Sequence, residues 1–171
     1  FTYHFASGDT KTPSRPGFSL PNSTRVLTEL GWTGDVSSPT LVIEDLNWHH
    51  INPAIVGSDY DAYALARIPF TYEGITYKND LTVGTQTVGQ TDFVLNNPSG
   101  FGYWSVEFVI TLYRSGTPIA VTTVTQRELK PGEQRPISVN WFENPTGITD
   151  TEIQAHINVL DPSVFLPTER F

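Results

Sequence analysis

The chain of 171 residues contains neither cysteine nor methionine. Without cysteine, disulfides, thiolate metal sites and thiol nucleophiles are excluded. No apolar run approaches the roughly 20 residues that a membrane-spanning helix needs, so we expect no membrane span. The missing initiator methionine, with Phe1 in its place, indicates a processed mature form whose leader directed export. A domain excised from a longer chain is the alternative, and the first interpretation predicts an extracellular or cell-surface location.

Basic residues are also scarce. Ten Lys or Arg against 18 Asp or Glu give a formal net charge of -8. The basic residues are spread singly from Lys11 to Arg170, so no basic patch is present that could release counterions from a phosphate backbone. This distribution excludes nucleic acid and anionic membranes as expected partners. Hydrophobic residues make up 38% of the chain, which argues against disorder and favours one domain with a core.

The sequence patterns of common catalytic and metal sites are missing as well. There is no G-x-S-x-G, no G-x-x-x-x-G-K-[ST] and no H-E-x-x-H. Adjacent His49 and His50 would point to opposite faces of an extended segment, which is poor geometry for one metal ion. Asp59 and Asp61 offer oxygen ligands to calcium as a weak alternative, because the spacing of an EF-hand is missing. We expect no enzymatic activity, no cofactor and no bound metal.

The clearest positive signal lies at residues 103–113 and predicts a β-strand. Five large apolar residues alternate there with a mostly polar set: Trp104, Val106, Phe108, Ile110 and Leu112. Successive side chains of a strand point to opposite faces, so these five would line one face, whereas a helix would scatter them. We expect Trp104, Phe108 and, in a later strand, Trp141 to lie in the core.

Turn signals separate further short strands about every 8–12 residues, which is typical of a β-sandwich or barrel. These strands are expected at residues 25–30, 41–48, 62–72, 75–77, 81–83, 93–95, 118–126, 137–141 and 153–159. In residues 41–48, Leu41 and Ile43 share one face and Leu46 and Trp48 the other, so the switch near Asp45 indicates a bulge or burial on both faces. No helix start followed by a helical period is found, and an all-β chain is predicted.

One part of the chain resembles a known group of proteins. The succession NNPSG, WSVEFVITLYRSG, IAVTTV, LKPGE, ISVNW and IQAHINV resembles the immunoglobulin-like, fibronectin type III-like modules of prokaryotic surface proteins, in particular the adhesion-related group called CARDB. The resemblance covers residues 93–160 and implies an immunoglobulin-like antiparallel β-sandwich more than any activity. We expect an extended proline-rich arm at 1–22, one sandwich domain at 23–162 and an extended tail at 163–171.

The first five residues alternate, with Phe1, Tyr3 and Phe5 on one face of a short strand that precedes a proline-rich linker. Burial of an aromatic side chain stabilises by about 1.5–3 kcal/mol, so this face needs a surface to cover it. The arm either folds back on its own domain or docks on a neighbouring subunit. In the second case the strand completes a sheet of the next subunit, and a head-to-tail contact of this kind grows a fibre. The main hypothesis is therefore an exported, non-enzymatic structural protein that forms a homopolymer, such as a filament or surface layer.

An alternative function uses the aromatic residues on the other face of the strands. Tyr103, Tyr113 and Phe142 would stack on sugar rings or contact a partner if exposed, although a covering segment would bury them. This predicts an adhesion module that binds a polysaccharide or a surface receptor. Asn22 begins the only glycosylation sequon with an allowed middle residue, which is a weak signal.

Overall fold

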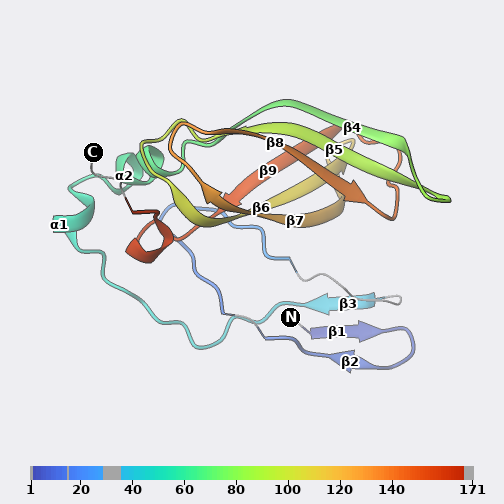
Figure 1. Ribbon diagram of the computed structural model, residues 1–171. Helices are drawn as coiled ribbons and strands as arrows, with labels where there is room; N and C mark the ends of the chain where they lie inside the picture. The colour runs from blue at the N-terminus through green and yellow to red at the C-terminus, as the bar shows by residue number, and fades with distance from the viewer. Residues whose placement is uncertain (1, 15, 29–35, 168–171) are drawn as a thin grey trace. The chain divides into compact units, whose positions relative to one another are not determined.

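The computed structural model of the protein describes residues 2–14, 16–28 and 36–167 (Figure 1). The chain divides into two compact units, Phe1–Ser58 and Asp59–Phe171. The first unit contains a small antiparallel sheet of β1 (Thr2–Phe5), β2 (Thr10–Lys11) and β3 (Val36–Thr40), in the order β2-β1-β3. It also contains a single helical turn, α1 (Pro53–Val56), which the side chain of Asn52 caps.

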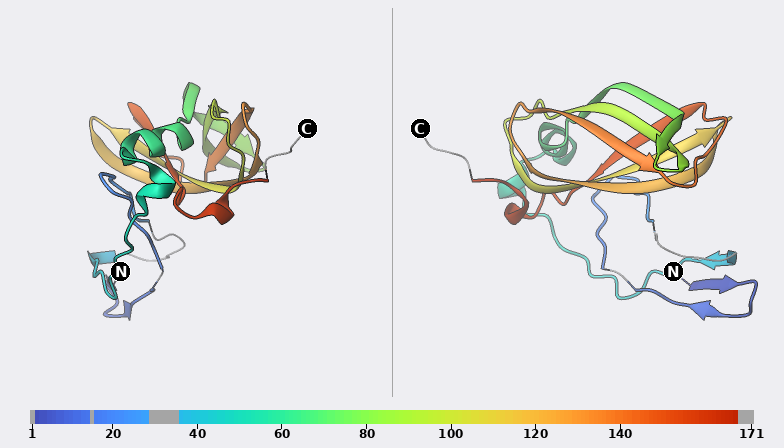
Figure 2. Two further views of the ribbon diagram at one scale, coloured as in Figure 1. Left: turned by 90° about the vertical axis from the view of Figure 1, so that its left-hand side faces the viewer. Right: turned by 45° about the vertical axis from the view of Figure 1, so that its right-hand side comes forward.

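The second unit is a sandwich of two three-stranded sheets, which Figure 2 shows from two further directions. One sheet has the order β4 (Thr71–Val83), β5 (Gln86–Asn96) and β8 (Gln134–Trp141). The other has the order β7 (Thr117–Leu129), β6 (Tyr103–Arg114) and β9 (Asp150–His156). All four pairings are antiparallel. The predicted all-β, immunoglobulin-like sandwich is confirmed.

The core lies between the inner faces of these sheets and follows the predicted alternation. Phe108 is fully buried and Trp141 is 6% exposed, as the sequence predicts for both. The Trp141 indole N–H donates to Thr91 Oγ1 at 2.9 Å, so its polar atom is satisfied inside the sandwich. The ring of Tyr72 packs edge-on against the rings of Phe93 and Phe108, with ring centroids 6.0 and 6.1 Å apart. Aromatic contacts therefore join the two sheets.

The prediction that Trp104 lies in the core is wrong. Trp104 is 48% exposed, whereas Tyr103 beside it is fully buried. The rings of Phe70 and Phe165 pack against the ring of Tyr103, with centroid distances of 5.4 and 5.5 Å. The Tyr103 hydroxyl donates to the carbonyl of Arg67. The alternation breaks at the start of β6 because these distant residues supply a site for both the ring and the hydroxyl of Tyr103.

The prediction of a chain without helices is also wrong, because α2 occupies Tyr60–Arg67. The sequence pattern predicts a strand from residue 62 to residue 72 here. Asp59 caps the helix by accepting the Ala62 N–H at 3.0 Å. The sequence YDAYALAR combines this cap with strong helix formers over only two turns, too short for a recognisable period. A 3₁₀ turn, η1 (Pro162–Val164), lies in the C-terminal segment.

Several strand boundaries differ from the prediction. Of the strands expected at 25–30 and 41–48, residues 25–28 and 41–48 form no strand, and residues 29 and 30 lie outside the described residues. The breaks between the strands expected at 62–72, 75–77 and 81–83 are instead two bulges within the continuous strand β4. Gly74 has a φ of 62°, so it permits a local kink without ending the strand.

We expect Phe108→Ala to lower the free energy of unfolding by about 3–5 kcal/mol, because it leaves a cavity between the two sheets. Trp104→Ala should cost about 1 kcal/mol or less, because its side chain is half in water. Urea unfolding of both variants measures the difference. A larger loss for Trp104→Ala than for Phe108→Ala would contradict the described burial.

Candidate functional site

The order of the strands shows where the sandwich is incomplete. In an immunoglobulin-like sandwich, strands A, B and E share one sheet and C′, C, F and G share the other. The order β4-β5-β8 corresponds to A-B-E, and β7-β6-β9 corresponds to C′-C-F. Strand G would follow β9 and pair with its outer edge. In the part of the chain that the structure describes, β9 is followed instead by η1 and by an isolated bridge between Phe165 and Tyr103.

Three of the four edge strands carry features that discourage further pairing. β4 has two register shifts. β7 has a bulge where Pro118 pairs with Tyr113, and Glu128 near its end has a φ of 52°. β8 contains Pro136, which lacks a backbone N–H. Bulges and prolines protect exposed edges from pairing with another chain.

The fourth edge strand, β9, has none of these features. Its register with β6 runs without a shift from Glu107↔His156 to Tyr113↔Asp150, and its sequence DTEIQAH contains neither proline nor glycine. Its outer edge pairs with no other strand among the described residues. A straight strand with a free edge is the structure to which an added strand binds through its main chain. The outer edge of β9, which no described strand pairs with, is therefore the candidate functional site.

The two faces of β9 differ in character. Ile153 points into the sandwich and is 8% exposed, while Thr151 and Ala155 on the same face are half-buried. On the outer face, the Tyr113 hydroxyl donates to Glu152 Oε2 and Gln154 Nε2 donates to Glu152 Oε1, both at 2.7 Å.

The hydrogen bond from Tyr113, aided by that from Gln154, lowers the pKa of Glu152. The same bond to Glu152 raises the pKa of Tyr113. These contacts keep the outer face of β9 ordered and charged near neutral pH. Its inner face is the side on which apolar surface is still available.

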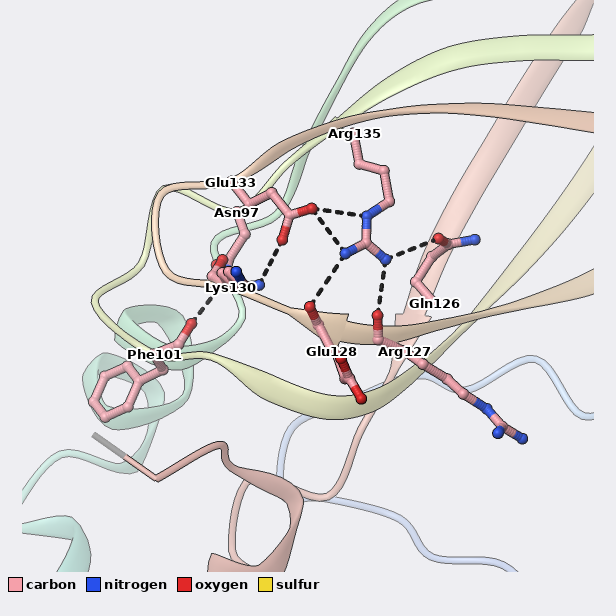
Figure 3. A network of polar contacts seen from close by, with 8 residues as sticks. All are labelled: Asn97, Phe101, Gln126, Arg127, Glu128, Lys130, Glu133 and Arg135. Carbon is pink, nitrogen blue, oxygen red and sulfur yellow. Dashed lines mark hydrogen bonds and ion pairs between the residues drawn. The ribbon is translucent and has the colours of Figure 1, made fainter. Parts of the chain in front are cut away.

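A polar network fixes the opposite corner of the sandwich, where β7 turns into β8 (Figure 3). Arg135 forms an ion pair with Glu133 at 2.7 Å and donates to the carbonyls of Arg127 and Glu128 at 2.9 and 3.2 Å. The Lys130 N–H donates to Glu133 Oε2 at 2.7 Å. Every partner of Arg135 in this network belongs to the turn or its flanking strands, so the network has a structural role.

Asn97 ties the neighbouring turn to this corner. Its side chain is 1% exposed, and its Nδ2 donates to the carbonyls of Phe101 and Lys130, both at 2.8 Å. Its Oδ1 accepts from the Ser99 hydroxyl at 2.6 Å. The Asn-rich turn that the sequence indicates is therefore a buried polar connection between the loops at this end of the sandwich.

The expected donor strand lies inside the first unit. Tyr3 is 8% exposed and lies with Phe5 on β1, while Phe1 lies outside the described residues. β1 pairs with β2 on one side and with β3 on the other. Both of its edges are thus occupied, so donation of this strand would require the small sheet to open.

The three aromatic residues of the predicted ligand surface do not form one surface. Tyr103 is fully buried, which corrects the expectation that it contacts a ligand. Tyr113, at the other end of β6, is half-buried and bonded to Glu152. Phe142 directly follows β8 and is 75% exposed.

The remaining predicted site residues have local roles. Asp59 is the cap of α2 and Asp61 lies in its first turn. Among the described residues no group of three or more His, Cys, Asp or Glu is placed to hold a metal ion. Asn22 lies exposed in a turn with a φ of 54°. No helix in the described ranges is long and apolar enough to cross a membrane.

One exposed apolar segment has no assigned role in the sequence-based interpretation, which placed it in the sandwich as a strand. Residues 41–48 expose five large apolar side chains, with the following exposed fractions: Leu41 48%, Val42 57%, Ile43 65%, Leu46 67% and Trp48 88%. Its strand-like sequence was a visible signal, but nothing in the sequence shows that these side chains stay in water.

Comparisons of the chain with models of protein families, with curated proteins and with solved structures gave no match. The functional argument therefore depends on the geometry of the sandwich.

We expect Glu133→Gln to destabilise the sandwich in a pH-dependent way. Burial alone would raise the pKa of Glu133, but hydrogen bonds from Lys130 and Arg135 outweigh it and lower the pKa below 4.5. A carboxyl group whose pKa is lowered by folding stabilises the folded state at any pH above its ordinary pKa. This stabilisation is lost as the pH falls through the pKa of the folded state. Wild type should exceed the variant by about 1–3 kcal/mol at pH 7, and the difference should shrink under acid. Urea unfolding at several pH values measures this difference in the free energy of unfolding, with a substitution of the exposed Glu143, Glu143→Gln, as control. A difference that does not change with pH would contradict a lowered pKa of Glu133.

Proposed function

We propose that this chain is a non-enzymatic structural protein that self-assembles by β-strand addition. In this proposal, the N-terminal unit of one subunit, residues 1–58, supplies a strand that pairs with β9 of the next subunit. The observation that carries the proposal is the straight, unprotected edge of β9 at the place where the strand order leaves strand G unfilled. The strand of Phe1, Tyr3 and Phe5 is the donor that the sequence predicts.

The addition of a strand to β9 would be stabilised by its main chain and by its side chains. Main-chain hydrogen bonds along β9 supply affinity, and pockets for alternate side chains determine the register. In this proposal the inward-pointing side chains of the added strand pack beside Ile153 and the half-buried Thr151 and Ala155. The donating and accepting surfaces are different parts of the chain, so the contact is head-to-tail and grows an open fibre unless its rotation closes a ring.

An extracellular or cell-surface location is part of the proposal. It is supported by the resemblance of residues 93–160 to modules of prokaryotic surface proteins. The net charge of -8 favours solubility of the subunit before assembly, because like-charged chains repel one another.

A binding module for a polysaccharide or surface receptor is the second candidate, favoured by the 75% exposure of Phe142. Sugar rings stack on exposed aromatic faces. If this function holds, the chain is a monomer whose tryptophan fluorescence responds to a glycan. Phe142→Ala or Tyr113→Ala should then abolish the response, and an unchanged response in both would exclude these residues as the binding surface.

We expect Ala155→Lys to abolish assembly of the 19.0 kDa chain. Ala155 is half-buried and pairs with Phe108 on the inner face of β9, so a lysine there puts an inward-pointing charge where the side chains of an added strand would pack. The long lysine stem lets its ammonium group reach water, so the sandwich should still fold. Light scattering and negative-stain electron microscopy at neutral pH measure the loss of assemblies.

Ala120→Lys is the matched control. Ala120 is also half-buried on the inner face, pairs with Leu112 and lies on β7, the opposite edge of the same sheet. This variant should assemble like wild type. A monomeric wild type would contradict self-assembly, and equal loss in both variants would show that β9 has no special role.

A further inference from the structure

We infer that the donated strand is residues 41–48, LVIEDLNW, of a second copy of this chain, and that it docks along β9 as the seventh strand of the sandwich. The inference rests on the proposed function, because it names the segment that performs the strand addition. It differs from the sequence-based hypothesis, in which Phe1, Tyr3 and Phe5 are donated.

The state of the segment is the first argument. Residues 41–48 are neither helix nor strand, and no strand of the described chain pairs with them. Leu41, Ile43, Leu46 and Trp48 are between 48% and 88% exposed. So many large apolar groups in one exposed stretch mark an interaction site. β1, in contrast, already has a partner strand on each side.

The backbone at Asp45 is the second argument. In a regular strand, Leu41 and Ile43 would point to one face and Leu46 and Trp48 to the other. Asp45 has a φ of 53°, a left-handed conformation that Asp tolerates better than most residues. A bulge at such a residue inserts one extra position and reverses the alternation after it. With the bulge at Asp45, all four large side chains point to the same face, as a strand that covers a core requires.

The fit to β9 is the third argument. The segment has eight residues, one of which the bulge absorbs, and β9 has seven. The inner face at this edge offers apolar contacts from the half-buried Ala155 of β9. The other face of the segment carries Val42, Glu44 and Asn47, which would remain exposed.

The first experiment compares substitutions on the two faces of the segment. Ile43→Asp and Leu46→Asp should abolish assembly, because each places a carboxylate against the inner face of the sandwich. Val42→Asp introduces the same charge one residue away on the opposite face and should assemble like wild type. All three residues are exposed, so the subunits should fold alike, which far-ultraviolet circular dichroism checks.

The second experiment identifies the partner by cross-linking. The chain has no cysteine, so Val42→Cys and Glu152→Cys each introduce a single thiol. Mixed and treated with a short bismaleimide, the two variants should give a covalent dimer that contains one copy of each. Val42→Cys mixed with Thr125→Cys, on the exposed outer face of β7, should give none. A Val42→Cys, Glu152→Cys double variant that cross-links only within one chain would overturn the inference, since the segment would then complete its own sandwich.

The outcomes separate this inference from the proposed function. If Ala155→Lys abolishes assembly but Ile43→Asp and Leu46→Asp do not, strand addition at β9 holds and the donor is another segment. Deletion of residues 1–7 then tests β1 directly. If the wild-type chain is monomeric under all conditions in which it is folded, the proposed function fails and this inference fails with it.

Discussion

Every open sheet leaves a row of unpaired backbone N–H and C=O groups along each edge, and this constraint governs the sandwich. β4, β7 and β8 meet it with bulges or with a proline, so their edges are poor templates for another chain. β9 has neither a bulge nor a proline, and its register with β6 is unbroken. An edge without bulges or prolines is a template for pairing with another chain, and the proposed function is derived from this property.

The interior and the corners keep this edge straight. Phe108 and Trp141 hold the two sheets together, and Trp141 does so without leaving its N–H unsatisfied. The ion pair of Arg135 with Glu133 fixes the turn between β7 and β8.

The N-terminal unit changes how the aromatic start of the chain is understood. Tyr3 is already buried within the single chain, where β1 is the central strand of a small sheet. The apolar surface that is still exposed lies later, at residues 41–48. Strand addition therefore remains a coherent mechanism, while the segment best suited to perform it is not the one that the alternation of Phe1, Tyr3 and Phe5 suggests.

The sequence by itself determined the strands of the sandwich from residue 93 onward, because period-two alternation and Asn, Pro and Gly turns are local properties. It also indicated the irregularity near Asp45, where the left-handed backbone now lies. Only the tertiary structure decided that Tyr103 is buried and Trp104 exposed, since Phe70, Phe165 and Arg67 come from distant parts of the chain. It alone also shows which edge is unpaired, because pairing across a sheet depends on residues that no local pattern brings together.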